Sequence, residues 1–306
     1  MFRPLRTAFN LTKIPTSLTQ KVGSATLVNR IYKTRYAVKD QCYLPTCTVF
    51  ACITALEWTI FRQTQKWVTL SPQSVIYHID WNTKRGSKVT TVLECMKWRA
   101  IRFECDMPYM RKPLNCHGSE VRIKGYTELI GHHQIYASVV QGRAVIVRLS
   151  GLDVFDTKGV ITQQTVDRVL KSQRNQCDLW EDLKANPKFK LPRTCRANRR
   201  NTDGMFFGEC PYCDYGYGHH CVVLVGFEDH PDLGCVWVAV NSWGTEAGDR
   251  GYIMIQGSQK GDGVLHMNRR AWVIDDDWQE KSGIGTCSQN DIEQYLRSVN
   301  LDIKPK

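Results

Sequence analysis

A single apolar stretch, residues 47–62 (CTVFACITALEWTIFR), constrains the fold of this chain more than any other. Apolar residues recur there at helical spacing, from Val49 to Ile60, and they cover more than the single stripe of an amphipathic helix. Such a helix must be covered by other elements on most of its sides. A chain of 306 residues can supply that cover, as one large domain or two lobes. We therefore expect a long, buried helix that begins at Cys47.

The other predicted elements change character along the chain. Helical periodicity predicts helices over residues 89–101 and 132–142, with Gly142 as the C-cap of the second. Short β-branched runs follow at residues 144–149, 221–227, 235–241 and 251–255. The turn-rich EDHPDLG between the middle two runs predicts a hairpin. Helices first and strands after predict an α+β fold with two lobes that meet along an interface.

The net charge of +11 comes from two segments. Residues 1–39 hold eight Lys and Arg, residues 184–200 hold seven, and neither segment has an acid, which leaves 26 basic against 30 acidic residues elsewhere. For 184–200 we favour a solvated loop over the alternative, a patch for nucleic acid or an anionic surface. Nucleic-acid binding is therefore not expected. No apolar run approaches the ~18 residues of a membrane span, and the oligomeric state is left open.

The cysteines indicate a reducing environment. There are 13 of them, an odd number, and the N-terminus lacks the apolar core of a secretory signal. We therefore expect mostly free thiols in an intracellular compartment, the cytoplasm or an organelle. Three of the cysteines lie in apolar surroundings and are predicted to pack as small hydrophobic residues, namely Cys52, Cys95 and Cys221.

A CPYC sequence at residues 210–213 is the weak candidate for a metal site. Cys210 and Cys213 could hold zinc, form a local disulfide or redox pair, or remain free thiols. No second pair stands at the usual zinc spacing, so we favour free thiols. We expect neither a metal nor a cofactor.

Cys47 is a candidate nucleophile. A cysteine at a helix N-terminus beside an imidazole has a lowered pKa, and the thiolate is the reactive form. The Pro45-Thr46 break places Cys47 at the start of the predicted helix, where the first backbone N–H groups lack partners.

The residues around Cys47 resemble the active-site stretch of the papain family of cysteine proteases, which includes papain and the cathepsins. In VKDQCYLPTC, Gln41 precedes Cys47 by six residues, as in the family. HCVVLVGF, from His220, is similar to the family's histidine strand, and NSWGTEAGDRGYIMI, from Asn241, to its asparagine strand. Two shorter stretches also resemble the family, TLSPQSVIYHI at 69–79 and ECDMPY at 104–109. The order Cys, His, Asn agrees with the family.

This resemblance implies a two-lobe α+β papain-like fold. The helical left lobe would surround the helix that starts at Cys47, the right lobe would be an antiparallel, β-barrel-like structure, and the active site would lie in the cleft between them. The resemblance covers residues 27–256, with a basic, cysteine-containing insertion at about 161–217. Residues 1–26 are then a basic extension, either a transit peptide or a disordered tail, and residues 257–306 a C-terminal extension, with a last helix predicted over DIEQYLRSV.

The implied activity is that of a cysteine-type endopeptidase acting on peptides or proteins. Cys47 would attack the scissile carbonyl, His220 would carry the proton, and Asn241 would orient the imidazole. The Gln41 side chain and the Cys47 backbone N–H would bind the oxyanion. By the same resemblance, Trp243 would shield the contact between histidine and asparagine.

The substrate-binding residues depart from the family pattern. Thr48 and Ala247 replace two tryptophans, and the paired glycines that bind substrate backbone align with Arg85 and Gly86. Ala144 would form the wall of the specificity pocket.

Two further family features are absent. The family's disulfide would join the positions of Leu44 and His78, as a reducing compartment would permit. About 25 residues precede the domain, too few for the inhibitory propeptide. With the altered substrate positions, these departures motivate the alternative function, a catalytically inactive homologue that acts as a binding or scaffold protein.

Overall fold

The structure is a computed structural model. It describes residues 36–42, 44–79, 86–110, 119–150, 159–168, 219–258, 261 and 263–281. Several sequence predictions lie outside these ranges: the N-terminal extension, Arg85, most of the 161–217 insertion with Cys210 and Cys213, and the last helix. None of the helices within the described ranges is long and apolar enough to span a membrane.

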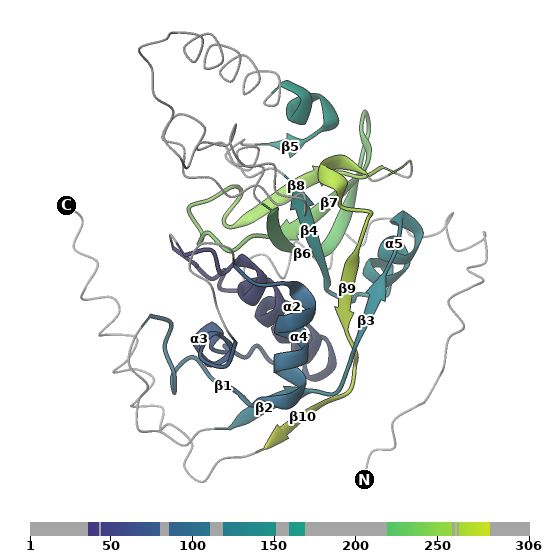
Figure 1. The fold of residues 1–306 in the computed structure, drawn as a ribbon. Helices are drawn as coiled ribbons and strands as arrows, with labels where there is room; N and C mark the ends of the chain where they lie inside the picture. The colour runs from purple at the N-terminus through teal and green to yellow at the C-terminus, as the bar shows by residue number, and fades with distance from the viewer. Residues whose placement is uncertain are drawn as a thin grey trace, which may run out of the picture.

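The predicted central helix is α2, Cys47–Thr64, and it begins at the predicted residue. Every side chain from Thr48 to Phe61 is buried. α2 contacts β6 of the main sheet as well as the helices α3 and α4, so that it is covered on several sides (Figure 1). This explains why its sequence lacks a continuous polar face.

The helical lobe contains two shorter helices, α3 (Pro72–Ile76) and α4 (Val89–Trp98), and a small sheet. α4 ends three residues before the predicted 101, because Arg99 turns to extended backbone and Ile101 pairs with Val121. The small sheet has the order β1 (Ile101–Arg102), β2 (Glu120–Ile123) and β10 (Trp278–Lys281).

The other lobe is built on a seven-stranded sheet in the order β3-β9-β4-β6-β7-β8-β5. Its strands are β3 (Tyr126–Leu129), β4 (Val145–Ser150), β5 (Val160–Ile161), β6 (His219–His230), β7 (Gly234–Val240), β8 (Tyr252–Gln256) and β9 (Ala271–Ile274). The four predicted strands are present, and β6 and β7 form the predicted hairpin. Among the described residues no pairing joins the two edge strands, so the sheet is not a closed barrel.

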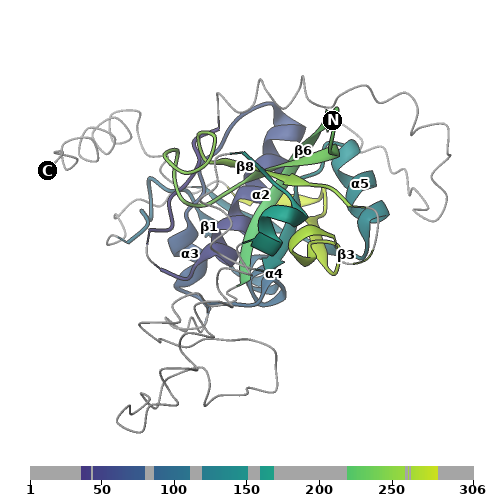
Figure 2. The ribbon, with the colours of Figure 1, turned by 90° about the horizontal axis from the view of Figure 1, so that it is seen from above.

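Side-chain alternation along the central strand β6 divides the core in two. Cys221 and Val223 belong to the cluster that includes α2, whereas Val222 and Leu224 belong to the cluster that includes α5 (His132–Val140). α5 stops before Gly142, whose positive φ of 73° favours glycine, as predicted for the C-cap region. In Figures 1 and 2, α3 and α5 lie on opposite sides of α2.

The folded part of the chain extends beyond residue 256, where the sequence predicted the domain to end. β9 pairs with both β3 and β4 of the main sheet, and β10 pairs with β2 of the small sheet. AWVI, the sequence of β9, is buried at all four positions, so it lacks the polar alternation by which a half-exposed strand is recognised. These two strands tie the C-terminal part of the described chain to both lobes.

Candidate active site

Backbone pairing brings the segment before α2 to the segment after β7. The Gln41 N–H donates to the Ser242 carbonyl at 2.8 Å, and the Gly244 N–H donates to the Lys39 carbonyl at 3.0 Å. Asp40 and Trp243 form an antiparallel bridge between these two bonds. The motifs that the sequence separates by about 200 residues therefore share one short ladder.

His220 lies on β6, and Asn241 directly follows the neighbouring strand β7. The His220 Nε2 lies 2.7 Å from the Asn241 Oδ1, which also accepts the Ser242 N–H at 2.8 Å. Both side chains are buried. The centroid of the Trp243 ring lies 4.9 Å from that of the imidazole, with the two ring planes tilted by 32°.

Cys47 reaches the same place from the N-terminus of α2. Thr46 precedes it without capping the helix through its side chain. The thiol of Cys221 and the imidazole of His220 hold the pKa of the Cys47 thiol well below its usual value, although burial opposes this effect. The pKa of Cys221 is raised by its contact with Cys47 and by burial. Of the two thiols, Cys47 is the one whose pKa is lowered and Cys221 the one whose pKa is raised.

Gln41 is fixed at both ends of its side-chain amide. Its Oε1 accepts the Ser242 hydroxyl at 2.5 Å, and its Nε2 donates to the Leu44 carbonyl at 2.8 Å. The Nε2 carries a second hydrogen, which remains available for an oxyanion. Ser242 thus orients Gln41, a role that the motif match alone did not reveal.

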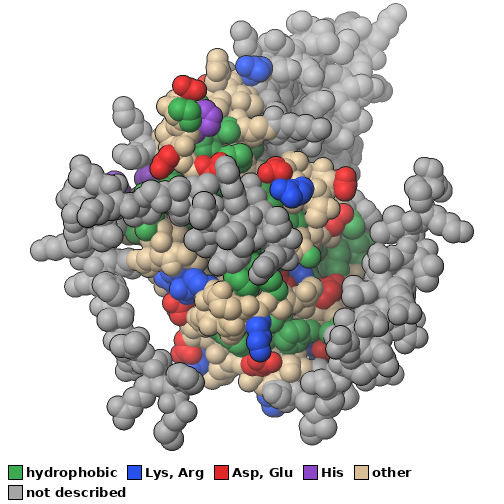
Figure 3. Space-filling model, turned by 180° about the vertical axis from the view of Figure 1, so that it is seen from behind, with side chains coloured by type: hydrophobic (Ala, Val, Ile, Leu, Met, Phe, Trp, Pro, Cys, Tyr) green, Lys and Arg blue, Asp and Glu red, His purple; other side chains and the backbone are tan. Residues whose placement is uncertain are grey.

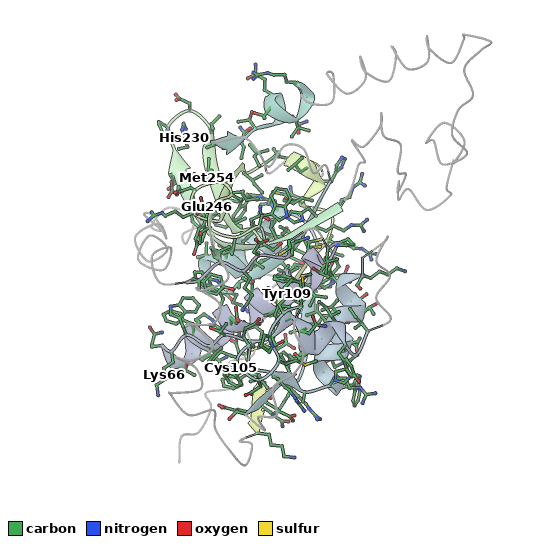
Figure 4. The ribbon with its side chains drawn as sticks, turned by 90° about the vertical axis from the view of Figure 1, so that its left-hand side faces the viewer. Lys66, Cys105, Tyr109, His230, Glu246 and Met254 are labelled. Atoms are coloured by element: carbon green, nitrogen blue, oxygen red, sulfur yellow. The ribbon has the colours of Figure 1, made fainter. Side chains whose placement is uncertain are left out.

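Tyr109 braces the loop that leads to Cys47. Its hydroxyl donates to the Gln41 carbonyl at 3.0 Å and lies 3.1 Å from the Thr46 hydroxyl. In Figure 4, Tyr109 lies between the helical side, where Lys66 and Cys105 are labelled, and the sheet side, where His230, Glu246 and Met254 are labelled. These hydrogen bonds hold a loop that lacks the family disulfide, whose cysteines would stand at Leu44 and His78.

A buried carboxylate anchors the segment before Gln41. Glu57, 1% exposed, pairs with Lys39 at 3.1 Å and accepts the Tyr36 hydroxyl and the Leu70 N–H, each at 2.6 Å. Burial and this carboxylate raise the pKa of Tyr36 well above its usual value. The sequence showed Lys39 only as a motif match, since its partner lies 18 residues away on a helix.

The predicted substrate-binding residues are only partly described. Gly86 has φ +64°, and a Cβ there would lie 2.8 Å from the Pro45 carbonyl oxygen, so that only glycine fits beside the loop. Thr48, which replaces a family tryptophan, donates to the Ser87 carbonyl at 3.0 Å. Ala144 is buried in the cluster that also contains Cys221.

The remaining sequence predictions concern thiols, metals and charge. The seven cysteines of the described residues are free thiols; of the three predicted to be buried, Cys52 and Cys221 are buried and Cys95 is only partly buried. In the described ranges, no three His, Cys, Asp or Glu side chains gather as a metal site. Basic and acidic side chains are interspersed over the face in Figure 3. Most of the two basic segments lies outside the described residues, so the nucleic-acid alternative stays untested.

Two curated relatives share low but extended similarity with this chain. Cathepsin K of Gallus gallus is 24% identical over 233 residues, covering 73% of this chain and 56% of the relative. Vignain of Phaseolus vulgaris is 25% identical over 223 residues, covering 72% and 50%. The chain thus spans about half the length of the curated relatives it matches.

Solved structures agree on the fold. The bromelain protease from Ananas comosus in complex with the E64 inhibitor has a TM-score of 0.54 at 16% identity, covering 79% of this chain and 94% of that one. A structure described in terms of the limited antibody cross reactivity between the mite allergens Blo t 1 and Der p 1 has a TM-score of 0.53 at 17% identity, covering 78% of this chain and 66% of that one. These similarities show a papain-like α+β fold.

The sequence pattern described as papain family cysteine protease matches residues 29–274. This match spans most of the chain and ends at the last residue of β9. The chain therefore belongs to the papain family of cysteine proteases.

Proposed function

We propose that this chain is an active thiol endopeptidase that hydrolyses peptide bonds through an acyl-enzyme on Cys47. The observation that carries the proposal is the 2.7 Å contact between His220 Nε2 and Asn241 Oδ1, together with the lowered pKa of Cys47. Because Asn241 engages Nε2, Nδ1 is the ring nitrogen that can serve the thiol. The resulting thiolate and imidazolium are the reactive pair that amide hydrolysis needs.

The proposed reaction has two stages. Cys47 attacks the scissile carbonyl, and the tetrahedral oxyanion accepts hydrogen bonds from the Gln41 Nε2 and the Cys47 backbone N–H. His220 then gives its proton to the leaving amine, and the C–N bond breaks. In the second stage His220 takes a proton from water, which attacks the thioester and releases Cys47.

An extended peptide is the proposed substrate. Gly86 lies against the nucleophile loop and could offer its backbone to a substrate strand, as the family resemblance implies, with Ala144 at the specificity pocket. Arg85 beside it would add a positive charge, so we infer a preference for acidic or polar residues there.

The alternative is an inactive homologue that binds other proteins, favoured by Thr48 in place of the family tryptophan and by the engagement of Gln41 with Leu44. The two are separated by exposing the protein to a thiol-directed epoxide and assaying hydrolysis of an unselective peptide library. We expect epoxide at Cys47 by mass spectrometry, no such label in Cys47→Ala, and hydrolysis lost in both Cys47→Ala and His220→Ala. Alkylation of Cys47 without any hydrolysis would establish the inactive homologue instead.

A further inference from the structure

A second thiol faces the proposed nucleophile. Cys221, which follows His220 on β6, lies with its Sγ 3.5 Å from the hydroxyl of Thr48, the residue after Cys47. Cys221 belongs to the core cluster against which Cys47 packs, and its strand, β6, contacts α2, the helix that begins at Cys47. The sequence suggested only a small buried hydrophobic residue at this position. The fold instead places a second thiol in contact with the first turn of the helix that begins at Cys47.

The two thiols differ in accessibility and in charge. Cys47 is half-buried and can meet a small reagent, whereas Cys221 is 3% exposed. The pKa of Cys47 is lowered and that of Cys221 is raised, so Cys47 more readily takes the thiolate form with which peroxides react. An oxidant would therefore react first at Cys47, with Cys221 held in contact with the product.

The other thiols near Cys47 are less suited to react with it. Cys52 lies on the same helix five residues later, and α-helix geometry separates such Cα atoms by about 8.7 Å, beyond the ~7 Å limit for a disulfide. Cys235 lies on β7 opposite Asp229 and packs against the other core cluster. Cys221 comes from a strand that packs on α2, so helix geometry does not hold it away.

We propose that Cys47 and Cys221 form a reversible disulfide after a peroxide oxidises Cys47, which makes Cys221 the resolving thiol of an oxidation site at the nucleophile. The Cys47 thiolate attacks one peroxide oxygen, the O–O bond breaks, and Cys47 sulfenic acid and one water result once a proton is taken up. The Cys221 sulfur then attacks the Cys47 sulfur. An S–S bond forms, the S–O bond breaks, and the Cys221 proton leaves with the hydroxide as a second water.

This inference goes beyond the proposed function, because the disulfide does not require that the chain cleave peptides. Its consequence is protection. A sulfenic acid without a resolving thiol proceeds to sulfinic and sulfonic acids, which are irreversible, whereas a disulfide is returned to two thiols by reduction. While the disulfide exists, Cys47 cannot act as a nucleophile.

The test is treatment of the full chain with hydrogen peroxide, then non-reducing peptic digestion and mass spectrometry. We expect a linked pair of peptides that contain Cys47 and Cys221, and recovery of iodoacetamide labelling at Cys47 after dithiothreitol. In Cys221→Ser the linked pair should be missing, and Cys47 should accumulate sulfinic and sulfonic acid that dithiothreitol does not reverse.

The matched control is Cys235→Ser, a partly buried thiol on the neighbouring strand β7, which should behave as the wild type. Cys221→Ala, assayed beside Cys221→Ser with thermal unfolding of both, separates loss of the thiol from loss of the fold. Absence of the linked peptides in oxidised wild type, or equal over-oxidation in wild type and a folded Cys221 variant, would overturn the proposal. Neither readout uses peptide hydrolysis, so an inactive enzyme would leave the result interpretable.

Discussion

Helix α2 carries two acidic groups, the Cys47 thiol and the Glu57 carboxyl, whose surroundings differ. At its N-terminus, Cys47 is half-buried, and its partners His220 and Cys221 come from the opposite lobe. Ten residues later, about 15 Å along the helix, Glu57 is 1% exposed and enclosed by Lys39, Tyr36 and the Leu70 backbone.

The two groups show how one helix can both hold the fold together, through Glu57, and position a reactive side chain, Cys47. Donors satisfy each oxygen of the Glu57 carboxylate, so the group is stable and inert, and it holds the segment that leads to Gln41. The Cys47 thiol, whose pKa is lowered, is only half-buried and so remains accessible to reagents. A buried charge becomes a reactive group when its partners leave one side open.

The largest effect is expected at the reactive end. His220→Ala should lower kcat/KM for peptide hydrolysis on the order of 10⁴-fold or more. It should also raise the pKa of Cys47, because the imidazole that favours the thiolate is gone. In wild type, iodoacetamide should label Cys47 well below the ordinary thiol pKa of ~8.5, with the rate falling only as pH drops through the lowered pKa. The measurement is the labelling rate against pH.

The matched control for this prediction is His230→Ala, at the far end of the same strand β6. Its labelling profile should coincide with that of the wild type. Cys235 supplies an internal reference, since burial and Asp229 raise its pKa to about 12, and it should stay unlabelled across the same range. If the labelling rate of Cys47 against pH were the same in His220→Ala and wild type, His220 would not lower the pKa of Cys47.

The next effect concerns the inert end. Glu57→Gln should lower the free energy of unfolding by about 3–5 kcal/mol, because the Lys39 ammonium is left buried without its counter-charge. The measurement is denaturant unfolding. Combining Glu57→Gln with Lys39→Met should recover much of the loss, since it removes the unpaired charge.

Glu94→Gln is the control for the buried pair. Glu94 pairs with Lys97 on the surface of α4 at 3.3 Å with a side chain 45% exposed, so its loss should cost only about 0–1 kcal/mol. Equal losses in Glu57→Gln and Glu94→Gln would show that the enclosure of Glu57 contributes nothing.

The smallest effect is expected from Ser242→Ala, which removes the hydroxyl that orients Gln41. A lost hydrogen bond of ~1 kcal/mol would lower kcat about fivefold while KM changes little, because the oxyanion contact matters in the transition state. Steady-state kinetics with one peptide measures both constants. Thr245→Ala, which removes an exposed hydroxyl three residues away, is the control and should leave kcat unchanged. If Ser242→Ala changed KM but left kcat unaffected, the proposed role of Gln41 would be contradicted.

Much of the fold was predictable because local patterns carry it. The helix from Cys47, the hairpin of β6 and β7, and the strand at β8 followed from periodicity and turn residues. The strands β9 and β10 were missed; β9 is short and buried throughout, and its pairing with β3 and β4 is what makes it a strand. α4 ended early for the same kind of reason, a β-pairing of Ile101.

The candidate site divides in the same way. Motif order alone suggested Cys47, His220, Asn241 and Gln41, and the structure brings these four positions together, while their catalytic roles stay predictions. The partners that hold them were not readable from the sequence, because Ser242, Tyr109 and Glu57 act through contacts between segments far apart in the chain.

The papain-like fold could be predicted from the sequence, because the buried helix, the β-branched runs and the motifs are each recognised within a short stretch of the chain. The groups that surround Cys47 and Glu57, in contrast, follow from tertiary packing and are seen only in the structure. The sequence indicated that Cys221 is a small buried hydrophobic residue, and only the packing of β6 on α2 places it in the cluster against which Cys47 packs. The physical reason is that the reactivity of a buried group depends on which donors and charges surround it, and these come from distant parts of the chain.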